Sequence, residues 1–374
     1  MSKTRLLLVQ EAMGGCGRHV SDLVLGLDPE QYDITVIYGT SRIDEYYRSR
    51  LPEMAQHAQL IPCADLVRQI DLRHDMRAYR MVSRAIREFK PDIVHCHSSK
   101  AGAIGRLAAA RHGVKKIFYT PHAYAFQAPE FGGKKRALFV GVERWLSRHC
   151  TTMTFNVSRG ERQTALAEHL DDERKFEVVY NGISDMSVPS RHQARHQLGL
   201  PDDAHIIGVT ARLVEQKAPM TSAAIAANVI KSEPNTHMVY IGDGPFRIQM
   251  EEYFTREGVI DNVYFCGYRT DADALVSAFD IYLLTSLYEG MPYSLVESLR
   301  AGVPIAATDV TGNDEVVQQG INGMLFPSGD IQSGTDAVLQ LIRNPLPAEQ
   351  VRKTYVDRFT LGGMINRITA LYQQ

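Results

Sequence analysis

Short apolar runs alternate with amphipathic stretches along almost the whole chain. Runs without internal polar positions are typical of strands that are buried on both faces, as in parallel sheets. The stretches between them have helical spacing, as in Val20, Leu23, Val24 and Leu27. This alternation of strand and helix predicts a doubly wound α/β fold. The strands expected in the first half are Arg5–Val9, Ile34–Tyr38, Ile93–His97, Ile117–Thr120, Thr152–Val157 and Phe176–Tyr180.

The pattern breaks after residue 181 and then starts again. Polar residues and Pro189 follow Asn181-Gly182-Ile183, so we expect a linker near residues 182–190. This predicts an N-terminal domain over residues 1–182 and a C-terminal domain over 190–358. Since ligands bind at the carboxyl ends of parallel strands, we expect a cleft between the two domains. The strands expected in the second half are His205–Thr210, Met238–Ile241, Val263–Cys266, Ile281–Thr285 and Pro304–Thr308.

Composition adds few constraints. Of the 374 residues, 44% are hydrophobic and 22% are charged, which is typical of a globular protein. The first apolar run, Leu6–Val9, is too short for a signal peptide, and no stretch of about twenty apolar residues occurs. We therefore expect a cytoplasmic protein. The five cysteines are scattered and odd in number, which disfavours a disulfide framework.

Charge differs between the two halves, although the net charge of the chain is only −2. Residues 1–181 hold 27 Lys and Arg against 21 Asp and Glu, a net charge of +6. The remainder holds 14 against 22, a net charge of −8. This asymmetry indicates that the first half meets an anionic partner.

A glycine-rich loop follows the first strand. Gly14, Gly15 and Gly17 let backbone N–H groups approach an anion at the start of a helix. The dinucleotide-binding fingerprint needs a third glycine where Val20 lies, so an NAD site is disfavoured. A plain tight turn explains the loop about as well as an anion site.

Polar residues also lie at the end of the strand Ile93–His97. His95 and His97 share one face of the strand, but no third metal ligand lies at a suitable spacing, so we expect no metal there. The following turn, His97-Ser98-Ser99-Lys100, opens a helix and suits a phosphate group. A simple capped helix start is the alternative.

The strongest candidate site lies in the second half. Arg212 and Lys217 follow the strand His205–Thr210 on one loop, where two cations can bind the same oxyanion group. Glu289 precedes a tight loop of glycine and proline. We expect Glu297 in the first turn of the next helix, where a carboxylate favours the helix dipole and can bind a ribose diol. Taken singly, each of these charges also fits a solvated surface.

Together these residues resemble glycosyltransferase family 4, whose members are retaining enzymes of the GT-B fold. The resemblance rests on Arg212 with Lys217, on Gly242-Asp243-Gly244-Pro245, and on two glutamates separated by seven residues. Asn181-Gly182-Ile183 and Gly302-Val303-Pro304 add to it, and it extends over nearly the whole chain. The segment that begins at His97 resembles that of members building bacterial exopolysaccharides on lipid carriers.

The resemblance implies transfer of a sugar from a nucleotide donor, expected to be a UDP-sugar, to a glycan acceptor that is expected to be lipid-linked. Arg212 and Lys217 would neutralise the donor diphosphate in place of a metal, Glu289 would bind sugar hydroxyls, and Glu297 would bind the ribose. His122 matches a family histidine that touches the transferred sugar. Other residues expected at the donor are Gly15, Gly17, Gly242, Tyr268, Gly290, Met291, Pro292, Tyr293 and Ser294. The residues expected at the acceptor are His97, Ser98, Ser99 and Lys100.

Two features of the chain depart from or extend beyond this pattern. Ala211 and Ala218 stand where the family commonly has glycine, which leaves the donor sugar open. The last helix, about residues 361–374, would cross back to the first domain. A nucleotide-sugar 2-epimerase of the same architecture stays an alternative, as does a non-catalytic protein that binds a sugar or a nucleotide. Nucleic acid is disfavoured, because no basic stripe is interleaved with stacking aromatics.

Two segments of the first half combine basic and apolar residues and could contact an anionic membrane from the cytoplasmic side. The alternative for both is a solvated helix face with a protein core behind it. The first segment consists of Arg73, Arg77, Arg80, Arg84 and Arg87 with Met76, Tyr79, Ile86 and Phe89. The second consists of Lys134, Lys135 and Arg136 with Leu138, Phe139, Val142, Trp145 and Leu146.

Overall fold

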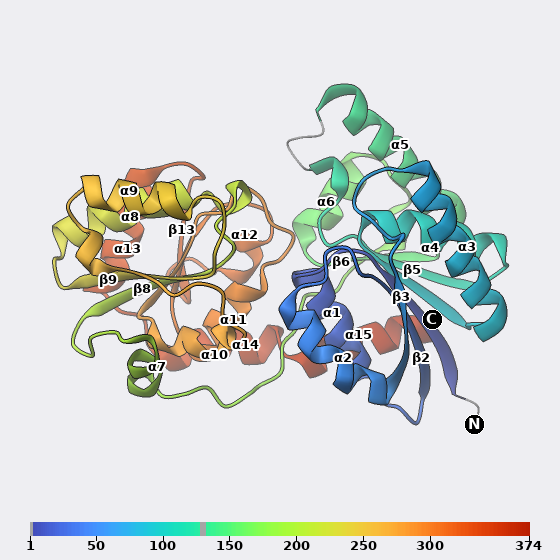
Figure 1. Cartoon of the computed structure of the whole chain (residues 1–374), viewed down its shortest axis with the longest axis horizontal. Coiled ribbons are helices and arrows are strands. Elements are labelled where there is room, and N and C mark those ends of the chain that lie inside the picture. The colour runs from blue at the N-terminus through green and yellow to red at the C-terminus, as the bar shows by residue number, and fades with distance from the viewer. Residues whose placement is uncertain (1–2, 128–131) are drawn as a thin grey trace. The chain divides into compact units, whose positions relative to one another are not determined.

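The computed structural model describes residues 3–127 and 132–374, and the chain forms two compact units. The first unit holds the residues up to Asn181 together with Leu361–Gln374, and the second holds Gly182–Thr360. Each unit is built on one sheet of parallel strands that is flanked by helices (Figure 1). The expected α/β fold with two doubly wound parallel sheets is therefore confirmed. The expected cleft between two domains stays a prediction.

The sheet of the first unit has the strand order β3-β2-β1-β4-β5-β6-β7. The edge strand β3 is an addition to the strands expected from the sequence. The ends of the other strands of this sheet agree with the expected strands to within about two residues. The bounds are β1 (Thr4–Gln10), β2 (Tyr32–Gly39), β3 (Ala58–Cys63), β4 (Ile93–His97), β5 (Lys116–Thr120), β6 (Met153–Asn156) and β7 (Phe176–Val178).

Alternate side chains of β1 enter two separate cores, which is why its residues Leu6–Val9 are all apolar. Leu7 and Val9 belong to the core on one face of the sheet, and Leu6 and Leu8 belong to the core on the other. The helices that cover the two faces are α1 (Gly15–Gly26), α2 (Glu45–His57), α3 (Leu72–Phe89), α4 (Ser99–Arg111), α5 (Gly133–Cys150), α6 (Arg159–Ala167) and α15 (Leu361–Gln373).

Most of the apolar stripe of α3 belongs to the core. Ile86 is buried, and Tyr79 and Phe89 pack against the same core, whereas Met76 is exposed. A core behind the helix therefore explains three of the four apolar residues, and contact of this helix with a membrane stays a prediction. On α5 the stripe is divided, because Leu146 is buried whereas Trp145 is half exposed.

The sheet of the second unit has the order β10-β9-β8-β11-β12-β13, and the edge strand β13 was again not expected. Its strands are β8 (His205–Thr210), β9 (Thr236–Ile241), β10 (Val263–Phe265), β11 (Ile281–Leu284), β12 (Ile305–Thr308) and β13 (Gly323–Phe326). Its helices are α7 (Arg191–Leu198), α8 (Pro219–Ser232), α9 (Arg247–Arg256), α10 (Ala272–Leu275), α11 (Tyr293–Ala301), α12 (Asn313–Val316), α13 (Ile331–Arg343) and α14 (Ala348–Arg358).

The last helix belongs to the first unit although its neighbours in sequence belong to the second. Met364, Ile368 and Leu371 of α15 are buried in the same core as Leu6 and Leu8. The hydroxyl of Tyr372 lies 2.6 Å from Nδ1 of His95 on β4, so the helix also reaches the polar interior of the first sheet.

No helix among residues 3–127 and 132–374 is long and apolar enough to cross a membrane.

Candidate functional site

Predicted site residues lie where the strand order of each sheet reverses. In the second unit β8 lies between β9 and β11, and in the first unit β1 lies between β2 and β4. Doubly wound sheets bind ligands outside the carboxyl ends of the strands at this switch point. Arg212 and Lys217 follow β8, and Glu289 follows β11. His97 ends β4, and the glycine loop follows β1.

The loops after β8 and β11 are tied to one another. The hydroxyl of Thr285 donates a hydrogen bond of 2.9 Å to the backbone oxygen of Lys217, and the N–H of Leu287 donates one of 2.9 Å to that of Gln216. The ammonium group of Lys217 also donates to Oε1 of Glu289. The structure therefore brings together two of the residues that the sequence assigned to the donor site, 72 positions apart.

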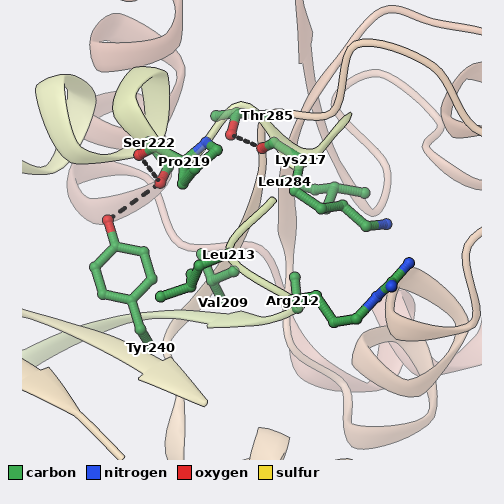
Figure 2. A pocket seen from close by; sticks show the side chains of 10 residues that line it. Val209, Arg212, Leu213, Lys217, Pro219, Ser222, Tyr240, Leu284 and Thr285 are labelled. Carbon is green, nitrogen blue, oxygen red and sulfur yellow. Dashed lines mark hydrogen bonds between the residues drawn. The ribbon is translucent and has the colours of Figure 1, made fainter. Parts of the chain in front are cut away.

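Arg212 lines the same pocket as Lys217 but, unlike Lys217, does not contact a carboxylate within the described residues. Its side chain is exposed, and no hydrogen bond or ion pair within the described part of the chain involves its guanidinium group. Figure 2 shows the side chains of Arg212 and Lys217 directed the same way, away from Tyr240 at the other end of the pocket. A free guanidinium and a partly buried ammonium lining one pocket form a binding place for an anion.

The glycine at the end of β9 is required by the loop that carries Arg212. Gly242 has a φ of 143°, and a Cβ atom on it would lie 2.0 Å from the backbone oxygen of Ala211. Its N–H donates a hydrogen bond of 2.8 Å to the oxygen of Gly267, which precedes the exposed Tyr268. The Gly-Asp-Gly segment thus holds the loops after β8, β9 and β10 in close contact.

The glycine-proline loop after Glu289 leads directly into α11. Pro292 is the cap residue and Tyr293 the first residue of this helix. Glu297 is therefore its fifth residue, in the second turn, and the expected first-turn position is wrong because the helix begins earlier than expected. Its side chain is buried and contributes to the raised pKa of Tyr282, for which burial is the main cause. The backbone of Gly290 lies close to Gly312. A Cβ atom on Gly312 would lie 2.3 Å from the backbone oxygen of Gly290.

In the first unit the glycine loop is partly engaged within the protein. Gly14 has a φ of 66°, and its N–H donates a hydrogen bond of 2.8 Å to Oδ2 of Asp44. Gly15 opens α1 and is exposed, whereas Gly17 is buried against the ring of Tyr47. The start of α1 is therefore exposed, whereas Gly17 lets α1 and α2 approach closely; a contact of either glycine with the donor stays a prediction.

The residues expected at the acceptor differ in how far they are already bonded. Lys100 donates to the backbone oxygen of Gln69 and to the carboxylate of Asp75, so its charge is compensated. The hydroxyl of Ser99 accepts a hydrogen bond of 3.3 Å from the N–H of Ala125. Ser98, with a φ of 71°, caps α4, and its buried hydroxyl has no partner within the described residues. Among the described atoms of this turn, the hydroxyl of Ser98 and Nε2 of His97 are thus without a hydrogen-bond partner.

His97 and His122 are brought together at the carboxyl edge of the first sheet. Nδ1 of His97 lies 3.3 Å from Nε2 of His122, and the rings of both lie about 5 Å from the ring of His19 on α1. His95 and His97 do share one face of β4, with ring centroids 4.0 Å apart. His19 and His122 therefore lie near His97, which the spacing of these residues along the chain did not predict.

Burial controls the protonation of these histidines. It lowers the pKa of His19 to about 4, although a hydrogen bond with Asn181 acts in the opposite direction. It holds the pKa of His95, His97 and His122 well below the usual range, with smaller contributions from neighbouring imidazoles. All four side chains are therefore neutral at pH 7.

Glu161 positions the loop of His122, and sequence reasoning gave it no role. His122 and Ala123 have φ values of 53° and 75°, which non-glycine residues seldom adopt. Oε1 of Glu161 accepts a hydrogen bond of 2.6 Å from the N–H of Ala123, and Oε2 accepts one of 2.8 Å from Val157. The sequence Ser158-Arg159-Gly160-Glu161 has the spacing of a capping box, so the helix start could have been found there, but not the bond to Ala123.

The fold and the site define a two-unit α/β protein in which Arg212 and Lys217 line one pocket at the switch point of the second sheet. The family model "Glycosyltransferase Family 4" matches residues 13–185, and the model "Glycosyl transferases group 1" matches residues 190–356. The two matches meet near the boundary between the two units at Asn181 and Gly182. The chain belongs to this family of glycosyltransferases.

Several bacterial glycosyltransferases are similar to the chain over most of its length. The Escherichia coli UDP-Gal:alpha-D-GlcNAc-diphosphoundecaprenol alpha-1,3-galactosyltransferase is 28% identical, and the match covers 92% of this chain and 90% of that protein. The putative glycosyltransferase EpsD of Bacillus subtilis is 28% identical over 72% of each chain.

Solved structures share the fold at lower identity. The Anabaena protein HepE, crystallised in complex with UDP, has a TM-score of 0.81 and 19% identity, and the match covers 99% of this chain and 100% of that one. The lipopolysaccharide glycosyltransferase WaaG has a TM-score of 0.75 and 17% identity, with coverage of 98% and 99%. These matches show that the chain has the GT-B fold.

Proposed function

We propose that this glycosyltransferase moves a sugar from a UDP-sugar to a lipid-linked glycan during synthesis of a bacterial exopolysaccharide or surface polysaccharide, with retention of configuration. The observation that carries the proposal is the contact of Lys217 with Glu289 in a pocket that Arg212 also lines. The donor is inferred from the same pocket, from the UDP-Gal in the name of the Escherichia coli relative, and from the UDP bound to HepE.

The chemistry of transfer asks for stabilisation of a leaving diphosphate while the anomeric carbon becomes cationic. The guanidinium of Arg212 and the ammonium of Lys217 supply positive charge at the place where negative charge develops. We assign no metal to this step, since the two cations serve the purpose. Glu289, already in contact with Lys217, would bind hydroxyls of the sugar, and the buried Glu297 would bind the ribose.

The first unit would supply the acceptor side. His122 is assigned to the transferred sugar, and its neutral imidazole can donate or accept a hydrogen bond with a hydroxyl. Because Lys100 is compensated by Asp75, we assign an acceptor phosphate to Ser98 and to the N–H groups at the start of α4. A lipid-linked diphosphate acceptor is favoured by the diphosphoundecaprenol in the name of the Escherichia coli relative.

A transferase is better supported than either alternative. Both family models and the relatives named above are glycosyltransferases, whereas a 2-epimerase or a non-catalytic binding protein has no such support. An epimerase would release an epimer or a free sugar without any acceptor. A binding protein would show saturable binding of the nucleotide sugar with no product.

Helix α5 offers a surface for an anionic membrane. Leu138, Val142 and Trp145 are exposed and lie four and three residues apart, on one side of the helix. Lys134 and Lys135, also exposed, precede them in the first turn. This combination would place the protein on the cytoplasmic face of the membrane, next to a lipid-linked acceptor. Co-sedimentation with phosphatidylglycerol vesicles should fall in a Trp145→Asp variant and stay unchanged in Ile248→Asp, at a hydrophobic residue of the second unit that is more exposed than Trp145.

The direct test is a transfer assay with purified protein. A panel of UDP-sugars is offered with a synthetic N-acetylglucosamine diphosphate polyprenol, and the anomeric configuration of the product is read by NMR. Retention with one donor of the panel is the expected result. Inversion would contradict the assignment to a retaining enzyme, and consumption of donor in the absence of acceptor would favour the epimerase.

A further inference from the structure

Three histidines from distant parts of the first unit converge on one point. His19 lies on α1, His97 ends β4, and His122 follows β5. Each offers one ring nitrogen, and these nitrogens all lie within 4.8 Å of one another. Nε2 of His19 is buried and has no hydrogen-bond partner within the described residues. Buried polar atoms are normally bonded, so this nitrogen, in a cluster of three imidazoles, indicates a ligand that completes the cluster.

The fourth histidine of the cluster shows what a satisfied imidazole looks like here. Nδ1 of His95 lies 2.6 Å from the hydroxyl of Tyr372, and its Nε2 lies 2.8 Å from that of Thr120. Both of its nitrogens are therefore used within the protein, and His95 has no lone pair to offer. His95 therefore has a structural role, unlike His19, His97 and His122.

The distance between His97 and His122 fits two ligands of one metal ion. Their nitrogens lie 3.3 Å apart. Two imidazoles at the usual Zn–N distance in a tetrahedral site are separated by about 3.4 Å. A hydrogen bond between the two rings explains the same distance, but it leaves Nε2 of His19 without a role. A metal ion would use a ring nitrogen of all three side chains.

Asn181 orients His19 as a second-shell partner does in metal sites. Its Oδ1 lies 3.1 Å from Nδ1 of His19 and can accept the proton on that nitrogen. The tautomer with the proton on Nδ1 leaves the lone pair on Nε2, which is the atom without a partner. Ligating histidines usually donate their other N–H in this way, which fixes the ring and its tautomer.

We propose that His19, His97 and His122 bind one divalent transition-metal ion, such as Zn²⁺, with a fourth coordination position open. Imidazole ligands select zinc, copper or nickel over magnesium or calcium, and three histidines with an open position form a common zinc arrangement. His122 is partly exposed, so the open position would lie on its side. The site uses residues of the first unit alone and does not involve Arg212 or Lys217, but it includes His122, which is assigned above to the transferred sugar.

Metal binding to the full-length protein, freed of any affinity tag and without nucleotide sugar, tests the proposal. Zn²⁺ is titrated calorimetrically, and Co²⁺ is followed by the visible absorption of a four-coordinate ion. One ion per chain is expected. His19→Ala and His97→Ala should abolish the absorption, and Asn181→Ala should weaken binding by about 10- to 100-fold, as loss of an outer-shell partner does. His112→Ala, at an exposed histidine of the same unit, should bind as the wild type does.

X-ray absorption at the zinc edge gives a reading that does not depend on the folding of any variant. Three imidazole ligands in the wild-type protein would support the site. No stoichiometric binding by the wild type, a spectrum with fewer than two imidazoles, or undiminished affinity in a folded His97→Ala protein would each overturn it.

Discussion

The ammonium group of Lys217 contacts Oε1 of Glu289, although the two residues are 72 positions apart in the chain. The carboxylate is more buried than the ammonium, with 8% of its side chain exposed against 20%. Glu289 therefore compensates Lys217, whereas the exposed Arg212 in the same pocket has no such partner within the described residues. An incoming diphosphate meets one free cation and one that is shared with a carboxylate.

Glu289→Gln should separate binding of the nucleotide from binding of the sugar. The variant keeps the shape of the side chain but removes the charge that compensates Lys217. We expect UDP to bind at least as tightly as before, and kcat/KM for transfer to fall by roughly 10- to 100-fold, the cost of about 1.5–3 kcal/mol for a charged hydrogen bond. Calorimetry with UDP and steady-state kinetics measure the two effects. Glu215→Gln, at an exposed glutamate beside Lys217, is the matched control.

Gly242→Ala should displace the loop that carries Arg212. The added Cβ would lie 2.0 Å from the oxygen of Ala211, at a φ of 143° that only glycine adopts easily. We expect a loss of about 1–3 kcal/mol or more in the free energy of unfolding, with weaker UDP binding. Gly141→Ala on α5, where nothing lies within 4 Å of the new Cβ, should be neutral or stabilising. Equal unfolding free energies for the two variants would contradict the close approach of the loops.

Acidification should destabilise the first unit through its buried histidines. Burial lowers the pKa of His19 to about 4, whereas an unfolded histidine titrates near 6.5. Between these values the unfolded chain binds more protons, so stability rises with pH and is lost as the pH falls below about 6.5. Each such histidine contributes a slope of about 1.4 kcal/mol per pH unit.

Urea unfolding of the chelated, metal-free protein between pH 5 and 7 measures this slope. His19→Gln should make it shallower by about one histidine's share, whereas His112→Gln, at an exposed histidine, should leave it unchanged. An unaltered slope in His19→Gln would show that His19 is already protonated in the folded protein.

Glu161→Gln should disturb His122 without touching a ligand. An amide at this position presents one N–H₂ group to the N–H donors of Ala123 and Val157, so one bond is lost. Because His122 and Ala123 are held at positive φ, we expect the loop to relax and kcat to fall more than the melting temperature would suggest. Dividing kcat by the folded fraction separates a loss of His122 positioning, which lowers the ratio, from a loss of stability alone, which leaves it unchanged. Glu30→Gln, at an exposed glutamate between α1 and β2, is the control.

The central strands of both sheets could be predicted from the sequence, and the edge strands could not. Strands such as β1 and β8 are buried on both faces, so their continuous apolar runs are unambiguous. The edge strand β3 includes Gln59 and Pro62 and is only partly buried, and β13 begins with a glycine. Polar residues and proline are tolerated at an edge because one side of the strand makes no ladder bonds.

The loops that carry Arg212, Lys217 and Glu289 could be predicted to lie at one edge of the sheet because they follow the strands β8 and β11, whereas the histidine cluster could not be predicted. The cluster depends on α1, β4 and β5 meeting at one edge of the sheet, which no spacing along the chain expresses. The compensation of Lys100 by Asp75 was invisible for the same reason. The position of Glu297 was missed because the helix begins at Tyr293, directly after Pro292, which places the glutamate in the second turn.

The transfer rate of Arg212→Ala tests most directly whether this pocket binds the leaving diphosphate. Removing one stabilising group from the charge that develops in a transition state costs about 10²–10³ in kcat, and the account predicts a loss of this size with the fold intact. Arg256→Ala, at an exposed arginine at the end of α9, should turn over normally. Near-normal turnover by a folded Arg212→Ala protein would contradict the assignment of the pocket to the donor.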